Sequence, residues 1–264
     1  MNLKDLELTI YRDPATPELD EQELCRYVEG TTSINTITKE SILERVDEAK
    51  VDVFSKRFAE SRVRDIEEKN EGFEPNFGEK RFEKRLIEDS SKDVKGVLYD
   101  AKKLEKIYLL LLNEQERSKN HLPFVLTNRL IGTFGEDNRY HARVSLYGFP
   151  MILSSTGLVE APAKPKQFYR KKRSNSLKTK EEIKEETEGD FIDYGENRIT
   201  KAMKGYLLQG IFHYLSKGFF CENNGCRFYN AHWQQELINA QINKPEFCNK
   251  HKKEIKEIKK RFSD

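Results

Sequence analysis

The feature that most restricts how this chain can fold is a cluster of cysteines and histidines near its C-terminal end. Residues 219–251, FFCENNGCRFYNAHWQQELINAQINKPEFCNKH, hold three of the four cysteines and two of the five histidines. Cys221 and Cys226 flank ENNG, and Asn and Gly in such a loop permit left-handed backbone and a tight return. Cys248 and His251 stand three residues apart on a predicted helix, so their side chains project from one face.

This donor set predicts a zinc site. Thiolate and imidazole are the ligands zinc prefers, and four protein ligands leave no coordination position open. We therefore expect one structural Zn²⁺ per chain, bound by the three clustered cysteines and His251. His213 and His232 are alternatives for the fourth ligand. The simpler interpretation is three ordinary buried thiols beside an exposed histidine, and a Cys221–Cys226 disulfide is disfavoured in a reducing compartment.

Composition limits the other classes of protein. A chain of 264 residues can bury a sizeable core, but 36% of its residues are hydrophobic and 35% are charged, so part of it must be solvated surface. A net charge of +2 argues against bulk coating of nucleic acid and still allows a local basic patch. The start, MNLKDLELTIYRDP, lacks a signal-peptide core, and no window approaches a membrane span. We expect a cytoplasmic protein without a membrane partner.

Residues 1–95 are expected to form an N-terminal portion of strands and helices. An amphipathic strand is predicted at 5–12 and a helix at 18–30, in which Cys25 is a buried thiol. A strand followed by a helix is predicted at 42–58. The charge-rich stretch 55–95 predicts a solvated, partly helical insertion.

Residues 96–264 are expected to form the zinc-binding portion, with a mobile loop at 164–190 where apolar periodicity disappears. Asn230 and Pro245 are predicted to begin the last two helices. A core helix is predicted at 94–116, strands at 121–134, 139–148 and 150–161, and further helices at 199–218, 232–242 and 245–262.

Two basic segments suggest a second class of partner. FYRKKR, with Arg170, Lys171, Lys172 and Arg173, joins cations to aromatic rings that can contact phosphates and stack on bases. The C-terminal KHKKEIKEIKKRF adds further cations. A nucleic-acid- or ribosome-associated factor is therefore one alternative function. The simpler interpretation is a surface loop whose basic and acidic halves neutralise each other.

The order of these motifs resembles the archaemetzincin family of zinc metallopeptidases. That family has an active-site helix with His-Glu-x-x-His, then a glycine, then Cys-x4-Cys and a later Cys-x-x-Cys. Here a predicted helix is followed by Gly218, by Cys221-ENNG-Cys226 and by Cys248-NK-His251. The resemblance covers roughly residues 97–255. It implies a zincin-like α/β (α+β) domain with a mixed sheet, an active-site-type helix and a helical, zinc-stapled C-terminal region.

The active-site motif itself is degenerate. If His213 takes the place of the second histidine, Gln209 and Gly210 stand where the first histidine and the glutamate belong. A catalytic zinc needs about three protein ligands and a free position for water, and the glutamate moves that water's proton. Gln209 is a poor zinc ligand, and glycine cannot act as a base. We expect Gln209 and His213 to make hydrogen bonds in a vestigial cleft, with His213 partly buried.

The expected function is therefore a zinc-binding protein related to metallopeptidases that has lost catalysis and binds a protein, a peptide or a ribonucleoprotein. The enzymatic alternative is an active metallopeptidase with an unusual ligand set, namely His213 with His141 or His232. Sequence alone leaves the choice open and leans toward the inactive protein.

Overall fold

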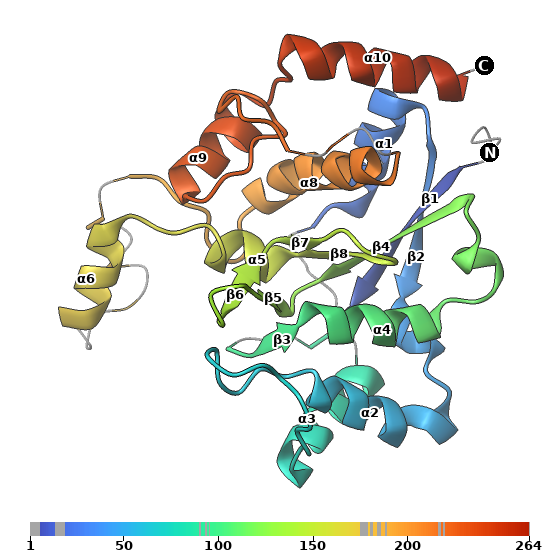
Figure 1. Ribbon diagram of the computed structural model, residues 1–264, viewed down its shortest axis with the longest axis vertical. Helices are drawn as coiled ribbons and strands as arrows, with labels where there is room; N and C mark the ends of the chain where they lie inside the picture. The colour runs from blue at the N-terminus through green and yellow to red at the C-terminus, as the bar shows by residue number, and fades with distance from the viewer. Residues whose placement is uncertain are drawn as a thin grey trace.

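A central five-stranded sheet organises the computed structural model, with strand order β2-β1-β4-β8-β7 (Figure 1). The first four of these strands run parallel, and β7 pairs antiparallel with β8. The strands are β1 (Glu7–Asp13), β2 (Asn35–Ser41), β4 (His121–Thr127), β7 (Ser145–Leu146) and β8 (Met151–Ser154). The structure describes residues 6–13, 19–89, 91–92, 94, 96–174, 179, 182–183, 186–187, 189–215, 218 and 220–263.

Both faces of this sheet are covered. All seven residues of β4 are buried, which is why its sequence HLPFVLT is almost continuously apolar. Alternation along the strands then assigns side chains to two cores, since successive residues point to opposite faces. Leu122 and Phe124 enter one core, and Val125 enters the other.

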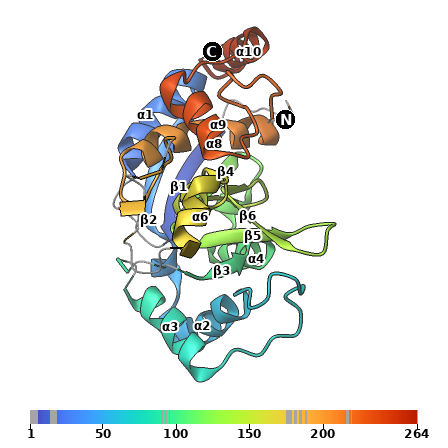
Figure 2. The same cartoon turned by 90° about the vertical axis from the view of Figure 1, so that its left-hand side faces the viewer.

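The first core is covered by helices from both ends of the chain, so β1 and the C-terminal helices belong to one packed body (Figure 2). Asp20 caps the first of these helices by accepting a hydrogen bond from the N–H of Glu23. These elements are α1 (Glu21–Thr32), α5 (Ser155–Glu160), α8 (Arg198–Tyr214), α9 (Gln234–Ile238), the π-helix η5 (Asn239–Asn243) and α10 (Asn249–Ser263).

The second core lies on the opposite face of the sheet. It includes a smaller sheet of order β3-β5-β6, in which β3 and β5 are parallel and β5 and β6 antiparallel. The elements of this side are η2 (Ile42–Arg45), η3 (Glu48–Lys50), α2 (Val51–Glu60), α3 (Phe77–Glu88), β3 (Leu98–Asp100), α4 (Ala101–Leu111), η4 (Gln115–Arg117), β5 (Leu130–Phe134) and β6 (Tyr140–Arg143).

The charged insertion is anchored to the body by a buried ion network. Glu83 of α3 and Asp13 of β1 both pair with Arg129, at 2.7 and 3.1 Å, and all three side chains are fully buried. The Arg129 guanidinium also lies 4.5 Å from the ring centre of Phe58 and 4.8 Å from that of Tyr99. The predicted insertion is partly helical and largely exposed, as expected, and it is docked on the body through Glu83.

The mixed α/β class expected from the sequence is confirmed, while several boundaries differ. The strand predicted to begin the segment 42–58 is wrong, because Ile42–Arg45 forms the 3-10 helix η2. The strand lies just before it, as β2 (Asn35–Ser41), and was not predicted from the sequence. The predicted helix at 94–116 is a short strand followed by α4. Asn230 and Pro245 do not begin helices, since α9 starts at Gln234 and α10 at Asn249.

The segment predicted as a mobile loop, 164–190, contains helix α6 (Lys166–Ser174). Phe168 of this helix packs with Ile183 and Phe191 in a small separate cluster. The sequence did not predict this cluster, because its apolar residues stand singly among charged ones. Across the described ranges of the chain, no helix is both long and apolar enough to cross a membrane.

Candidate metal centre

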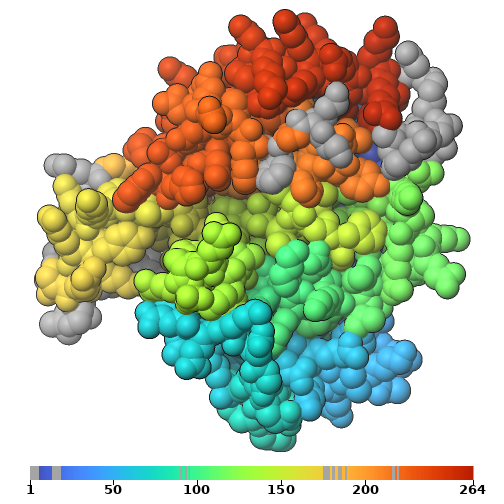
Figure 3. Space-filling view, viewed as in Figure 1, coloured from blue at the N-terminus to red at the C-terminus, as the bar shows by residue number. Residues whose placement is uncertain are grey.

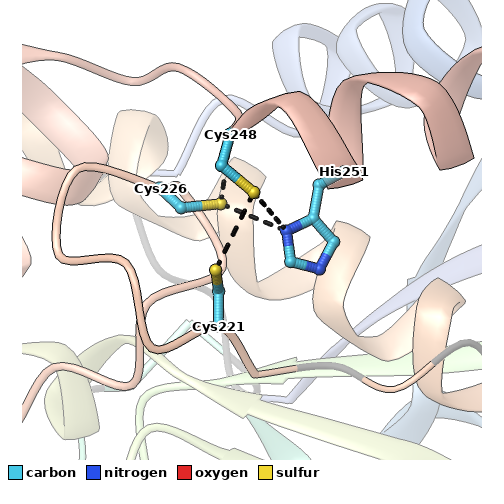
Figure 4. Close-up of side chains that lie close together, drawn as sticks. All are labelled: Cys221, Cys226, Cys248 and His251. Atoms are coloured by element: carbon cyan, nitrogen blue, oxygen red, sulfur yellow. Dashed lines mark hydrogen bonds between the residues drawn. The ribbon is translucent and has the colours of Figure 1, made fainter.

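The four predicted zinc ligands converge at the start of α10 (Figure 4). The ligand atoms of Cys221, Cys226, Cys248 and His251 all lie within 4.8 Å of one another. Cys226 and His251 are buried, and the other two are partly exposed. His213 and His232, the alternatives for the fourth ligand, are not members of this group.

The distances fit a tetrahedral zinc site. Zn–S bonds of about 2.3 Å and Zn–N bonds of about 2.05 Å place two sulfurs about 3.8 Å apart and a sulfur and a nitrogen about 3.6 Å apart. Cys221 Sγ lies 3.9 Å from Cys248 Sγ. His251 Nδ1 lies 3.4 Å from Cys226 Sγ and 3.2 Å from Cys248 Sγ. The donor set and its spacing therefore suit this ion.

A tight turn brings the first two cysteines together. The carbonyl of Asn223 accepts a hydrogen bond from the N–H of Cys226, and its side-chain oxygen accepts one from the N–H of Gly225, both at 2.9 Å. None of the ENNG residues has a positive φ, so side-chain capping closes this loop in place of the predicted left-handed backbone. The N–H of Cys221 then donates to the carbonyl of Phe228 at 2.8 Å.

The other two ligands are fixed by the beginning of α10. Cys248 precedes the helix, and its carbonyl accepts the N–H of Lys252 at 2.9 Å. Its own N–H points at Cys226 Sγ, 3.5 Å away. One helical turn later, the His251 ring packs 4.8 Å from the ring centre of Phe228. The helix thus presents both ligands to the loop.

The electrostatics of the four groups differ. Burial raises the pKa of the Cys226 thiol to about 12 and lowers the pKa of His251. Burial also acts to raise the pKa of Cys248, but the backbone N–H of His251 together with side-chain hydrogen bonds to Cys221 and Cys226 outweighs it and lowers that pKa. A divalent cation would replace the proton of a buried thiol, because a coordinating thiol is deprotonated outright.

One residue that sequence analysis missed supports His251 from behind. Glu254, one turn further along α10, places a carboxylate oxygen 3.7 Å from His251 Nε2. That oxygen is buried and makes no hydrogen bond. A carboxylate that accepts the other ring N–H of a ligating histidine orients the ring, and Glu254 at 3.7 Å lies just beyond that hydrogen bond. The i, i+3 spacing from His251 was the available signal.

The degenerate motif lies on α8, beside a separate cavity. Gln209 is buried, and its side-chain oxygen accepts a hydrogen bond from the Tyr147 hydroxyl at 2.7 Å. His213 is exposed, contrary to the expectation of a partly buried histidine, and its ring lies 5.9 Å from that of Tyr147. The predicted hydrogen bond of Gln209 is present, and Tyr147 is a partner that the sequence did not reveal.

Gly210 faces the sheet, away from that cavity. A Cβ atom at this position would lie 2.7 Å from Phe124 Cε1 on β4 and 2.7 Å from Met151 Sδ on β8. No real Cβ contact is this short, so even alanine requires the neighbours to move. The position that carries the glutamate in the resembling motif therefore has no room for a side chain.

The cavity beside α8 has a volume of about 470 Å³. His141, His213 and His232 all line it, together with Arg143, Tyr147 and other residues of the sheet edge. His141 Nε2 is 2.8 Å from a carboxylate oxygen of Asp137. Across the described residues, the Cys₃His group is the one set of three or more donors close enough to share a metal ion.

The predicted basic segment lies on α6. Arg170, Lys172 and Arg173 are exposed, while Lys171 is half-buried and lies 3.8 Å from a carboxylate oxygen of Glu186. This pairing agrees with the simpler interpretation, in which basic and acidic parts of the segment neutralise each other.

Comparison with known proteins gives a family and two distant structures. A model described as "Probable metallopeptidase family (DUF6775)" matches residues 4–258. An archaemetzincin from Methanopyrus kandleri aligns over 97% of both chains with 9% identity and a TM-score of 0.46. A zinc-dependent peptidase from Methanocorpusculum labreanum aligns over 94% of this chain and 99% of its own, with 12% identity and a TM-score of 0.44. A search of curated proteins finds no match.

Proposed function

This chain belongs to the probable metallopeptidase family, and on that premise we propose that it is a zinc-binding member that does not cleave peptides. Its Cys₃His cluster would hold one structural Zn²⁺, and the cavity beside α8 would bind a peptide segment of a partner protein. The observation that carries this proposal is the position of Gly210, which packs against the sheet where a peptidase of the resembling type needs its glutamate.

The ligand set supports a structural role for the metal. Cys221, Cys226, Cys248 and His251 fill all four positions of a tetrahedral ion, so no position is left for the water that a catalytic zinc activates. When bound, the ion would supply charge neutralisation and a cross-link between the loop and α10. No proton transfer or attack on a substrate follows from such a site.

An extended peptide is the ligand that best suits the cavity. β7 is the last strand of the five-stranded sheet, and an exposed strand edge offers backbone hydrogen bonds to an added strand. Tyr147 and Tyr206 provide aromatic surface, and Phe220, 48% exposed, lies at the same cavity. Polar groups among apolar walls are typical of ligand sites.

An active metallopeptidase is the second candidate, and one observation favours it. His141, His213 and His232, which come from distant parts of the sequence, line the same cavity. Their ring nitrogens do not form a donor group among the described residues, so the three would have to converge when metal binds. This candidate requires a second, more labile zinc ion.

One experiment separates the two candidates. Protein labelled with ¹⁵N-histidine is mixed with a tryptic digest of casein, the imidazole resonances are followed by NMR, and the digest is then sequenced by mass spectrometry. We expect the resonances of His141, His213 and His232 to shift, that of the distant His121 to stay, and the peptides to remain intact.

Metal analysis on the same sample completes this test. One zinc ion per chain is expected, and it should be retained after dialysis against a weak chelator. Shortened peptides together with a second zinc, both lost in His213→Ala, would establish the active peptidase instead. Unchanged histidine resonances at millimolar peptide would rule out the peptide-binding role.

A further inference from the structure

Helix α10 has two different faces. Ile258 is buried in the first core, and Ile255 and Phe262 pack against that core. Two contacts tie the helix to the end of α1: Lys259 Nζ donates to the carbonyl of Gly30 at 2.7 Å, and Ser263 Oγ bonds to Ser33 Oγ at 2.8 Å. These contacts and the Cys₃His cluster at its first turn hold the helix in one orientation.

The outer face of α10 is strongly cationic. The helix carries six lysines and one arginine against two glutamates, a net charge of +5, although the whole chain has a net charge of only +2. Lys253, Lys256 and Lys260 follow one another at intervals of three and four residues, so they form a single row opposite the buried face. Figure 3 shows this helix along the upper edge of the molecular surface.

The row of lysines is not neutralised within the part of the chain that the structure describes. Lys252 pairs with Glu246 at 3.2 Å beside the row. Lys253, Lys256 and Lys260 are exposed and have no described ion-pair partner. Uncompensated like charges on one rigid face repel each other, and a polyanion that neutralises them releases its own counterions on binding.

We propose that the outer face of α10 binds the phosphate backbone of a nucleic acid. With a rise of about 1.5 Å per residue, the three lysines are spaced about 4.5 and 6 Å along the helix axis, within reach of successive phosphates for flexible lysine chains. Anionic membrane is the less suitable partner, because insertion needs a free apolar face and that of α10 is packed in the core. This inference does not depend on the proposed peptide site or on its metal.

The test measures affinity against salt. A fluorescein-labelled 20-nucleotide single-stranded RNA is titrated with the full-length protein from 50 to 200 mM NaCl. The variant is Lys253→Gln, Lys256→Gln, Lys260→Gln. Its control, Lys50→Gln, Lys80→Gln, Lys106→Gln, removes the same charge from the α2, α3 and α4 side of the molecule (Figure 1).

We expect wild type and the control to bind alike, and the α10 variant to bind at least tenfold more weakly at 50 mM NaCl. The slope of log K against log salt should fall in magnitude by about 2 in that variant, since each phosphate contact on a single strand contributes about −0.7. Equal affinities and slopes for the two variants would overturn the proposal. Absence of RNA binding by the wild-type protein would also overturn it. This holds even if phosphatidylserine vesicles bind through the same lysines.

Discussion

Cys226 Sγ lies 3.4 Å from Nδ1 of His251, which joins a loop to the first turn of a helix 25 residues further along the chain. Both side chains are buried, so water cannot solvate the thiol or the imidazole if the site holds no cation. A metal ion at this point would couple the fold of the C-terminal region to zinc concentration.

Removing one ligand should therefore destabilise the protein in a zinc-dependent way. At a free zinc concentration about 1,000-fold above Kd, the ion stabilises the folded state by about 4 kcal/mol. We expect Cys226→Ser to lose bound zinc and to unfold at a lower temperature, measured by mass spectrometry and by thermal denaturation with and without EDTA.

Cys25→Ser is the matched control, because Cys25 is also a buried thiol but lies outside the cluster. It should keep one zinc per chain and remain sensitive to EDTA. If Cys226→Ser retained full zinc content and wild-type stability, the structural metal would be refuted.

Acid should lower the free energy of unfolding through a second site, the buried carboxylate of Glu116. Arg45 and Lys39 both pair with Glu116, which is 3% exposed, with Arg45 Nη2 and Lys39 Nζ each 2.8 Å from its Oε1. Burial acts to raise the pKa of the Glu116 carboxyl, but hydrogen bonds from Arg45 and Lys39 outweigh it and lower that pKa well below the ordinary value of 4.5. The folded state thus binds a proton less readily than the unfolded chain.

The sign of the pH dependence follows from that shift. The stabilisation is fully present above about pH 4.5 and is lost as the pH falls toward the lowered pKa of the folded state. Glu116→Gln should remove it, lowering the free energy of unfolding by about 2 kcal/mol at pH 7 and flattening its dependence between about pH 5 and pH 3. Urea denaturation across that range gives both quantities, and an unchanged slope in the variant would contradict this assignment.

The metal cluster was predictable from sequence because its geometry is mostly local. A four-residue spacer and an i, i+3 pair each fix two ligands, so only one long-range contact had to be inferred. The ion network around Arg129 was not predictable, since its partners Asp13 and Glu83 lie 116 and 46 residues away. Charge-rich sequence indicates solvated surface by default, and only the tertiary structure shows which charges are buried.

The predicted start of the last helix was wrong for a related reason. Pro245 has the right chemistry for a first helical position, yet α10 starts at Asn249, after Cys248. The preceding residues are held by tertiary contacts, such as the carbonyl of Glu246 accepting the N–H of Arg227 at 2.7 Å. Long-range hydrogen bonds of this kind override local propensity.

The packing of Gly210 leads to a mutational prediction. Gly210→Ala places a methyl group against Phe124 and Met151 and should lower the free energy of unfolding by about 1–3 kcal/mol through overpacking. Gly30→Ala is the control, because Gly30 is also a helical glycine but has no atom within 4 Å of an added Cβ. That change should stabilise the protein by about 0.5–1 kcal/mol. Chemical denaturation of both variants checks this, and a stabilising Gly210→Ala would show that α8 can move away from the sheet.

The buried network around Arg129 should be the most sensitive point of the second core. Glu83→Gln keeps the shape of the side chain but leaves Arg129 with a single carboxylate, Asp13, inside a fully buried site. Glu83 also lies 3.5 Å from Arg62 Nε, so the variant leaves two arginines to share one buried carboxylate. An uncompensated charge of this kind costs about 3–5 kcal/mol. Unfolding in urea should therefore shift to markedly lower concentration in Glu83→Gln.

An exposed ion pair between Glu79 of the same helix and Arg64 of the preceding segment is the control for that variant. Glu79 pairs with Arg64 at 2.7 Å, and the Arg64 side chain is 51% exposed. Arg64→Gln breaks this contact, and an exposed ion pair contributes at most about 1 kcal/mol. We expect its denaturation midpoint to stay close to that of wild type. Equal midpoints for Glu83→Gln and Arg64→Gln would mean that α3 is not anchored through Arg129.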